Sequence, residues 1–168
     1  MQIVAIQDAN IIIDLIKIEL FSSCLRLPYQ FVTTNLIFYS ELNEDQVAIA
    51  EAHIQSEQFT LITISDEDLA AILIEAKTDT RLSEQDWSAY YYAQKLNALL
   101  LTGDKRLREM AEANNIQVCG ILWILDELLI KNIITRTEAL HYLKDLMQKN
   151  KRLPKKDCEV RLKEWGKG

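Results

Sequence analysis

Short runs of apolar residues alternate along this chain with longer amphipathic segments, and this alternation restricts the possible folds more than any other feature. The short runs are typical of strands and lie at 2–7, 30–34, 59–64, 98–101 and 116–119. The segments between them predict helices at 9–21, 35–42, 45–58, 65–78, 82–97 and 105–114. Three more helices are predicted at 121–131, 135–149 and 155–165. Strands joined through helices form right-handed crossovers, so we expect a three-layer α/β/α domain with a central parallel sheet and extra C-terminal helices.

Size and composition are those of an ordinary folded domain. The chain has 168 residues, of which 49% are hydrophobic and 26% charged, so it can form a core without disulfides or a structural metal. Its three cysteines, Cys24, Cys119 and Cys158, are far apart in the sequence, which indicates reduced thiols. No apolar run reaches the length of a membrane span, and the N-terminus does not resemble a signal peptide. We therefore expect a soluble cytoplasmic protein with no membrane partner.

Charge is distributed unevenly along the chain. The formal net charge is −6, yet residues 149–168 carry eight basic and three acidic residues, which leaves eleven basic and twenty-two acidic residues for the other 148. An acidic body is not typical of a nucleic-acid-binding protein. A polyanionic substrate would therefore need cations from the basic tail, from bound metal, or from both. A solvated basic helix is the simpler interpretation of the tail.

Two aspartates stand at the carboxyl ends of predicted strands. Asp8 follows the first strand, and Asp104 follows the strand at 98–101. Ligands of open parallel sheets bind beyond the carboxyl ends of the strands, so both side chains are candidates for a functional site. Asp is also a preferred N-cap, and each residue is explained equally well as the cap of the helix that follows it.

Two further acids stand on predicted helices. Asp86 follows Ser83 by three residues, which fits a capping box, but it also lies on the helix face expected to meet the sheet, where a carboxylate needs partners. Glu41 shares a face with Ile37 and Phe38 and stands at the C-terminal end of its helix, where the helix dipole disfavours an anion. Because both the apolar helix face and the helix dipole are unfavourable for a carboxylate at this position, we favour a functional role for Glu41.

Convergence of these four carboxylates would create a site for hard cations. Four acids within ~5 Å of one another repel by roughly 3 kcal/mol per pair at an effective dielectric constant of about 20, so they need a counter-charge. Ligands that are all oxygen favour Mg²⁺ or Mn²⁺, and two such ions activate water in phosphodiester hydrolysis. Zinc is disfavoured because His53 and His141 are far apart with no further His or Cys nearby. Phosphate-binding glycine loops and a serine-hydrolase elbow are absent from the sequence.

Four segments, taken in order, resemble the motifs of the PIN-domain family of metal-dependent ribonucleases. They are Ile6-Gln7-Asp8-Ala9-Asn10, the run from Thr33 to Leu42, Leu82-Ser83-Glu84-Gln85-Asp86 with Ala89 and Ala93, and Leu101-Thr102-Gly103-Asp104-Lys105-Arg106-Leu107. The fourth is the most specific, and together they extend over residues 1 to about 125. The resemblance implies a PIN-like domain at 1–133, followed by a helical extension at 134–168 that contains the basic tail.

The resemblance also implies a function, a cofactor and partners. The residues that match the family's metal ligands, and so its catalytic residues, are Asp8, Glu41, Asp86 and Asp104. Those that match supporting polar groups near the metal are Asn10 and Thr102. The implied cofactor is Mg²⁺ or Mn²⁺, the implied substrate is single-stranded RNA, and members often form homodimers. Many bacterial members are toxins of the VapBC type with a partner antitoxin, although the helices after Ile133 exceed the compact toxin pattern.

Two other functions stay open from the sequence. A catalytically inert PIN-like module that binds a protein or RNA has the same fold, since a fold does not guarantee activity. A phosphotransfer fold of the haloacid-dehalogenase or receiver type also ends a strand in Asp. The dehalogenase motif needs Asp-x-Asp, where this chain has Asn10 in the second place, and a receiver needs paired acids at its first strand, where this chain offers only Asp8. We therefore favour a metal-dependent endoribonuclease.

Overall fold

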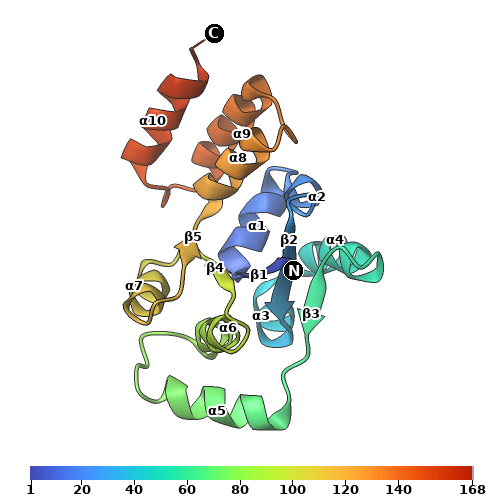
Figure 1. Cartoon of the computed structure of the whole chain (residues 1–168), viewed down its shortest axis with the longest axis vertical. Coiled ribbons are helices and arrows are strands. Elements are labelled where there is room, and N and C mark those ends of the chain that lie inside the picture. The colour runs from blue at the N-terminus through green and yellow to red at the C-terminus, as the bar shows by residue number, and fades with distance from the viewer. Residues whose placement is uncertain (168) are drawn as a thin grey trace.

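The computed structural model describes residues 1–167, which form a sheet of five parallel strands. The spatial order of the strands is β3-β2-β1-β4-β5 (Figure 1). Ile6 in the central strand is in register with Val32 on one side and with Leu100 on the other. The strands are β1 (Ile3–Gln7), β2 (Tyr29–Thr34), β3 (Thr60–Ile62), β4 (Leu99–Leu101) and β5 (Val118–Cys119). Because all five strands are parallel, their carboxyl ends lie at one edge of the sheet, the carboxyl edge.

Helices cover both faces of the sheet, which confirms the predicted three-layer α/β/α class. Strand residues alternate between the two cores: Ala5 and Phe31 belong to one, Ile6 and Val32 to the other. The first core is covered by α1 (Ala9–Lys17), α2 (Phe21–Cys24), α4 (Glu44–Gln55), α8 (Ile121–Ile130) and α9 (Arg136–Lys149). The second core is covered by α5 (Asp66–Ala76), α6 (Glu84–Lys95) and α7 (Lys105–Ala113). Figure 1 shows α1, α8 and α9 on one side of the sheet and α5 and α6 on the other.

Helix α3 (Asn35–Glu41) joins the two cores at the end of β2. Its neighbouring residues Ile37 and Phe38 are both fully buried, but Ile37 packs in the second core and Phe38 in the first. The helix begins at an N-cap, Thr34, whose side chain accepts a hydrogen bond from the backbone N of Ile37 at 3.2 Å. Helix α3 is therefore fixed at the carboxyl edge by the last residue of β2.

The single helix predicted at 9–21 is wrong in its extent. Helix α1 ends at Lys17, and Glu19 adopts a left-handed backbone conformation with φ of 57°. This conformation stops a right-handed helix, and the chain then turns into the short α2. The turn is itself part of the core, since Ile18, Leu20 and Phe21 are all buried, so the apolar run in the sequence continues past the end of the helix. A helix and a buried turn thus have the same apolar composition here.

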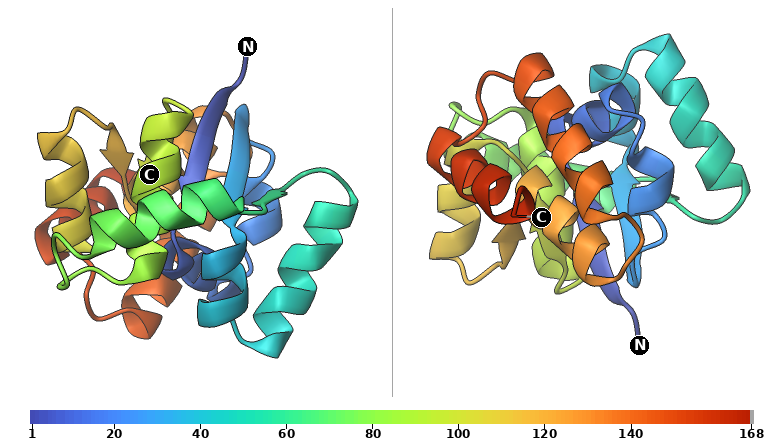
Figure 2. Two further views of the ribbon diagram at one scale, coloured as in Figure 1. Left: turned by 90° about the horizontal axis from the view of Figure 1, so that it is seen from below. Right: turned by 90° about the horizontal axis from the view of Figure 1, so that it is seen from above.

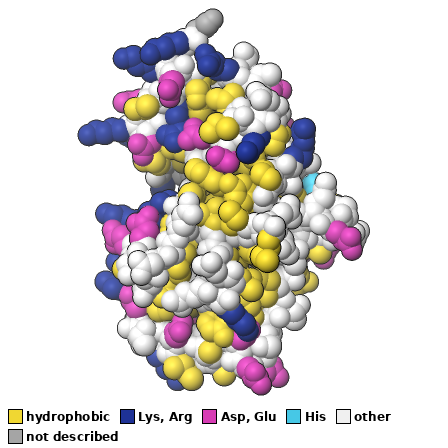
Figure 3. Space-filling view, in the orientation of Figure 1, with side chains coloured by type: hydrophobic (Ala, Val, Ile, Leu, Met, Phe, Trp, Pro, Cys, Tyr) yellow, Lys and Arg dark blue, Asp and Glu magenta, His cyan; other side chains and the backbone are white. Residues whose placement is uncertain are grey.

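The C-terminal helices pack on the first core. Helix α10 (Lys155–Trp165) contributes Cys158 and Trp165, and α9 contributes Leu143 and Leu146, to the same buried cluster that contains Leu15 of α1. Lys and Arg side chains gather over α10 in the upper part of the molecule, as the uneven charge predicts (Figure 3). Both views of Figure 2 show α9 and α10 folded against the rest of the chain. Within residues 1–167, no helix is long and apolar enough to cross a membrane.

Candidate functional site

Asp8 is the most buried of the predicted acids and lies at the centre of a hydrogen-bond network. It is the N-cap of α1, and its Oδ1 accepts a hydrogen bond from the backbone N of Ala9 at 2.8 Å. Its Oδ2 accepts hydrogen bonds from Oγ1 of Thr102 at 2.7 Å and from Nδ2 of Asn10 at 3.0 Å. The residue is only 2% exposed, so these bonds offset part of the cost of burying a carboxylate. Asp8 therefore both caps a helix and stands at the carboxyl edge.

Thr102 and Asn10 connect Asp8 to the end of β4. Besides donating to Asp8, Oγ1 of Thr102 accepts a hydrogen bond from the backbone N of Asp104 at 3.1 Å. Asn10 spans the same gap, because its Oδ1 accepts a hydrogen bond from the backbone N of Gly103 at 2.9 Å. The structure thus brings Asp8, Asn10, Thr102 and Asp104 into one network that joins the ends of β1 and β4.

Asp104 and Asp86 are both fixed by capping hydrogen bonds. Oδ1 of Asp104, the N-cap of α7, accepts a hydrogen bond from the backbone N of Leu107 at 2.8 Å. Asp86 completes a capping box, since its Oδ2 accepts a hydrogen bond from the backbone N of Ser83 at 3.0 Å and its own N donates to Oγ of Ser83 at 3.1 Å. Asp86 is half-buried, and the following residues on its face, Ala89 among them, meet the sheet. The capping role that the sequence offered as an alternative is thus present at both acids.

Glu41 is exposed, which corrects the expectation that it is buried beside Ile37 and Phe38. Helix α3 ends at this residue, so no further turn covers its side chain. Its carboxyl group nevertheless lies close enough to Asp86 for the two charges to interact. The structure therefore places Glu41 at the carboxyl edge, where its side chain is exposed to solvent.

Thr34 and Ser88 belong to this edge and were not predicted. Their hydroxyl groups are 2.8 Å apart and both residues are fully buried, so they join α3, which carries Glu41, to α6, which carries Asp86. Ser88 also donates to the carbonyl O of Gln85 at 2.7 Å. The available signal was the polar pair at the end of the apolar run at 30–34, but its partner in α6 is 54 residues away.

Desolvation and nearby negative charges raise the pKa of Asp8, Glu41 and Asp86. Burial is the main cause that raises the pKa of Asp8 to about 7, and the charges of Asp86 and Glu41 add to it while hydrogen bonds to Asp8 oppose it. Although Glu41 is exposed as a residue, its carboxyl group is partly screened from water by the surrounding protein, and this desolvation, followed by the charge of Asp86, raises the pKa of Glu41. Burial raises the pKa of Asp86, local hydrogen bonds lower it, and the charge of Asp104 raises it. The four acids are thus linked electrostatically, as expected for carboxylates that share one edge.

The donor set fits a hard divalent cation in its chemistry. All four side chains supply oxygen, and like-charged carboxylates with raised pKa values are stabilised by a cation. Among the described residues, no three His, Cys, Asp or Glu side chains are yet close enough together to hold a metal ion. Capping hydrogen bonds hold Asp8, Asp86 and Asp104 in their present orientations.

Comparison with known proteins shows the family and the fold of the chain. The DUF3368 family model, described as a PIN domain, matches residues 4–167. The chain belongs to the PIN-domain family. This PIN domain is similar in fold to the crystal structure of PAE2754 from Pyrobaculum aerophilum, with a TM-score of 0.53 and 16% identity over 76% of this chain and 98% of that chain. A PilT N-terminus domain protein from the archaeon Sulfolobus solfataricus P2 aligns with a TM-score of 0.42 and 18% identity over 75% of this chain and 93% of that chain. No curated protein matches the chain.

Family membership adds a general function to the geometry. PIN domains are typically metal-dependent nucleases that bind Mg²⁺ or Mn²⁺. In this PIN domain the four acids come from four different places: the end of β1, the end of α3, the first turn of α6 and the N-cap of α7. The family model also extends through α10, so the C-terminal helices lie within the matched region.

Proposed function

We propose that this PIN domain is a metal-dependent endoribonuclease that hydrolyses phosphodiester bonds of single-stranded RNA. The observation that carries the proposal is the electrostatic linkage of Asp8, Glu41, Asp86 and Asp104 at the carboxyl edge. An open parallel sheet binds ligands at this edge. Membership of a family of nucleases supports the general chemistry.

The chain's own residues would fix the metal ligands. Asp8 is held by three hydrogen bonds, so its carboxylate keeps one orientation at the end of β1. Asp86 and Asp104 each use one oxygen, Oδ2 and Oδ1 respectively, for capping, which leaves the other oxygen of each as a ligand. Bound Mg²⁺ or Mn²⁺ supplies Lewis-acid activation of water and neutralises charge on the phosphodiester. Positioning by the protein is therefore its main contribution.

Substitution of Asp8 tests the proposal. Asp8→Asn is expected to lower the rate of cleavage of a labelled single-stranded oligoribonucleotide in Mn²⁺ by at least about 100-fold, because it removes a metal-ligand charge. Glu51→Gln changes an exposed acid of α4 outside the network and is the matched control, with an expected rate equal to the wild type. Equal cleavage by Asp8→Asn and the wild type would overturn the assignment.

An inert PIN-like module is the competing function. Titration of the wild-type chain with Mn²⁺ by calorimetry separates the two, since a nuclease of this type has to bind the ion near neutral pH. Absence of binding, together with absence of RNA cleavage, would support the inert module. A DNA oligonucleotide of the same sequence tests the choice of RNA. The homodimer and the antitoxin partner stay predictions.

A further inference from the structure

Arg81 is held rigidly by Asp79 in the loop between α5 and α6. Its Nε donates to Oδ1 of Asp79 at 2.8 Å and its Nη2 donates to Oδ2 at 2.7 Å, and its backbone N also donates to Oδ1 at 3.1 Å. The Arg81 side chain is nevertheless 65% exposed, against 24% for that of Asp79. The hydrogen bonds from Arg81 are the main cause that lowers the pKa of Asp79 to about 2. The guanidinium group is thus oriented but open to solvent.

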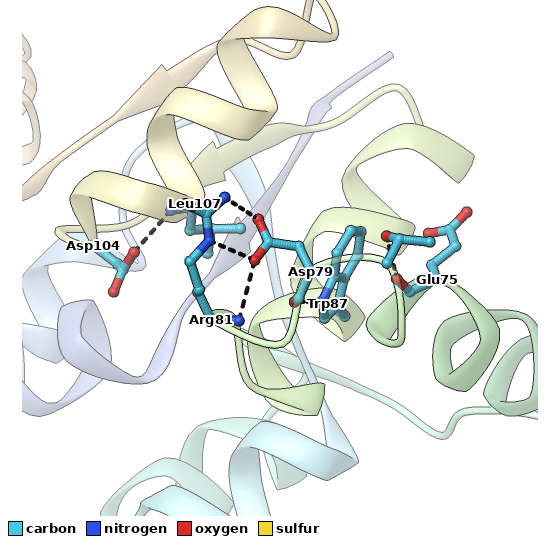
Figure 4. A network of polar contacts seen from close by, with 7 residues as sticks. Glu75, Asp79, Arg81, Trp87, Asp104 and Leu107 are labelled. Atoms are coloured by element: carbon cyan, nitrogen blue, oxygen red, sulfur yellow. Dashed lines mark hydrogen bonds and ion pairs between the residues drawn. The ribbon is translucent and has the colours of Figure 1, made fainter.

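The Asp79–Arg81 pair lies near two of the four acids at the carboxyl edge, Asp86 and Asp104. Nε1 of Trp87, in the first turn of α6, donates to the carbonyl O of Asp79 at 3.2 Å, so the pair is tied to the helix start that carries Asp86. The charge of Arg106, in the first turn of α7, also acts on Asp79. Figure 4 shows Arg81 and Asp79 beside the start of α7, where Asp104 stands. The pair therefore adjoins both helix starts that carry candidate metal ligands.

We propose that the free edge of the Arg81 guanidinium binds a phosphate of the RNA backbone adjacent to the acidic site. The inference rests on the proposed function, because the substrate is taken to be single-stranded RNA. Arg81 acts on substrate binding, and Asp79 acts through Arg81 as a positioning residue.

The hydrogen-bond geometry accounts for this role. Asp79 engages Nε and one N–H of Nη2, which leaves both N–H groups of Nη1 and the second N–H of Nη2 on the outer edge of the group. That edge presents paired donors suited to two phosphate oxygens. The four acids at the carboxyl edge repel the negatively charged RNA backbone. A fixed cation beside these acids reduces this repulsion where the RNA binds.

Paired substitutions distinguish phosphate binding from a merely structural clamp. The readout is the affinity for a fluorescent 2′-O-methyl oligoribonucleotide, which resists hydrolysis, measured by anisotropy over a range of salt concentrations. Arg81→Ala is expected to weaken binding about fivefold, as for one exposed charge-assisted contact, and to lower the slope of log Kd against log salt by about one. Arg81→Lys keeps the charge and should recover part of the affinity. Lys131→Ala removes an exposed charge at the far end of α8 and should bind like the wild type.

Asp79→Asn is the decisive comparison, because it breaks the same ion pair but keeps the cation. A smaller loss of affinity in Asp79→Asn than in Arg81→Ala supports phosphate binding. Equal losses in the two variants, or wild-type affinity in Arg81→Ala, would overturn it and leave the pair as a loop clamp. Absence of cleavage by the wild type together with Arg81-dependent binding would overturn the nuclease function alone.

Discussion

At the scale of single residues, Thr102 connects two of the four acids through its hydroxyl group. Its hydroxyl group donates to Asp8 and accepts from the backbone N of Asp104, so one buried oxygen sets the spacing of two candidate ligands. Its donation to Asp8 also opposes the rise in that carboxyl's pKa. A small side chain thus influences both the geometry and the charge of the site.

Replacement of Thr102 by Val removes the hydroxyl group with little change in shape. We expect the pKa of Asp8 to rise further, so that the acidic limb of the pH–rate profile for RNA cleavage moves to higher pH. The free energy of unfolding should fall by about 1–3 kcal/mol, because the buried carboxylate and the backbone N of Asp104 each lose a partner. Thr102→Ser keeps the hydroxyl group and should resemble the wild type. An unchanged acidic limb in Thr102→Val would contradict this role.

At the scale of elements, the ends of helices and strands depend on tertiary contacts that the hydrophobic pattern of the sequence does not predict. Helix α1 ends at Lys17, although the apolar character continues into α2. Strand β5 is limited to Val118 and Cys119, because only these positions pair with β4. Helix α10 reads as a solvated basic segment in the sequence, yet Cys158 and Trp165 are buried in the shared core.

Helix α10 is therefore expected to contribute to stability. Trp165 is 6% exposed, and Trp165→Ala should lower the free energy of unfolding in urea by about 3–5 kcal/mol, the usual cost of truncating a buried aromatic residue. Val160 lies on the same helix at 60% exposure, and Val160→Ala should stay within about 0.5 kcal/mol of the wild type. Equal effects of the two substitutions would mean that α10 adds little to the fold.

At the scale of the whole molecule, acids from separate elements act together on stability. Asp8, Glu41 and Asp86 have raised pKa values in the folded chain, so the folded state binds more protons than the unfolded state above about pH 4. The free energy of unfolding should consequently fall as pH rises towards about 7. The pKa values of Asp68 and Asp79 are lowered in the folded chain, so these two acids make the free energy of unfolding rise with pH, and they do so only below about pH 4.

Thermal unfolding without divalent ions measures this effect. The free energy of unfolding of the wild type, and with it the melting temperature, should decrease between pH 5 and pH 8. Asp8 should contribute about 3 kcal/mol to this decrease, since its folded pKa is about 7 and each of the two pH units from pH 5 to pH 7 is worth about 1.4 kcal/mol. Asp8→Asn cannot ionise at this position, so its decrease over the same range should be smaller. Identical pH dependence in the two proteins would show that Asp8 has an ordinary pKa.

The sequence by itself determined the kinds of elements, the parallel α/β/α class and the four acids at the ends of strands and helices. These features are local: hydrophobic periodicity and capping act over a few residues. Tertiary structure alone decided that Glu41 is exposed, that Thr34 meets Ser88, and that the Asp79–Arg81 pair lies near the start of α7. Those relations join residues far apart in the chain, or depend on how a loop packs, and only the packing of whole elements sets such distances.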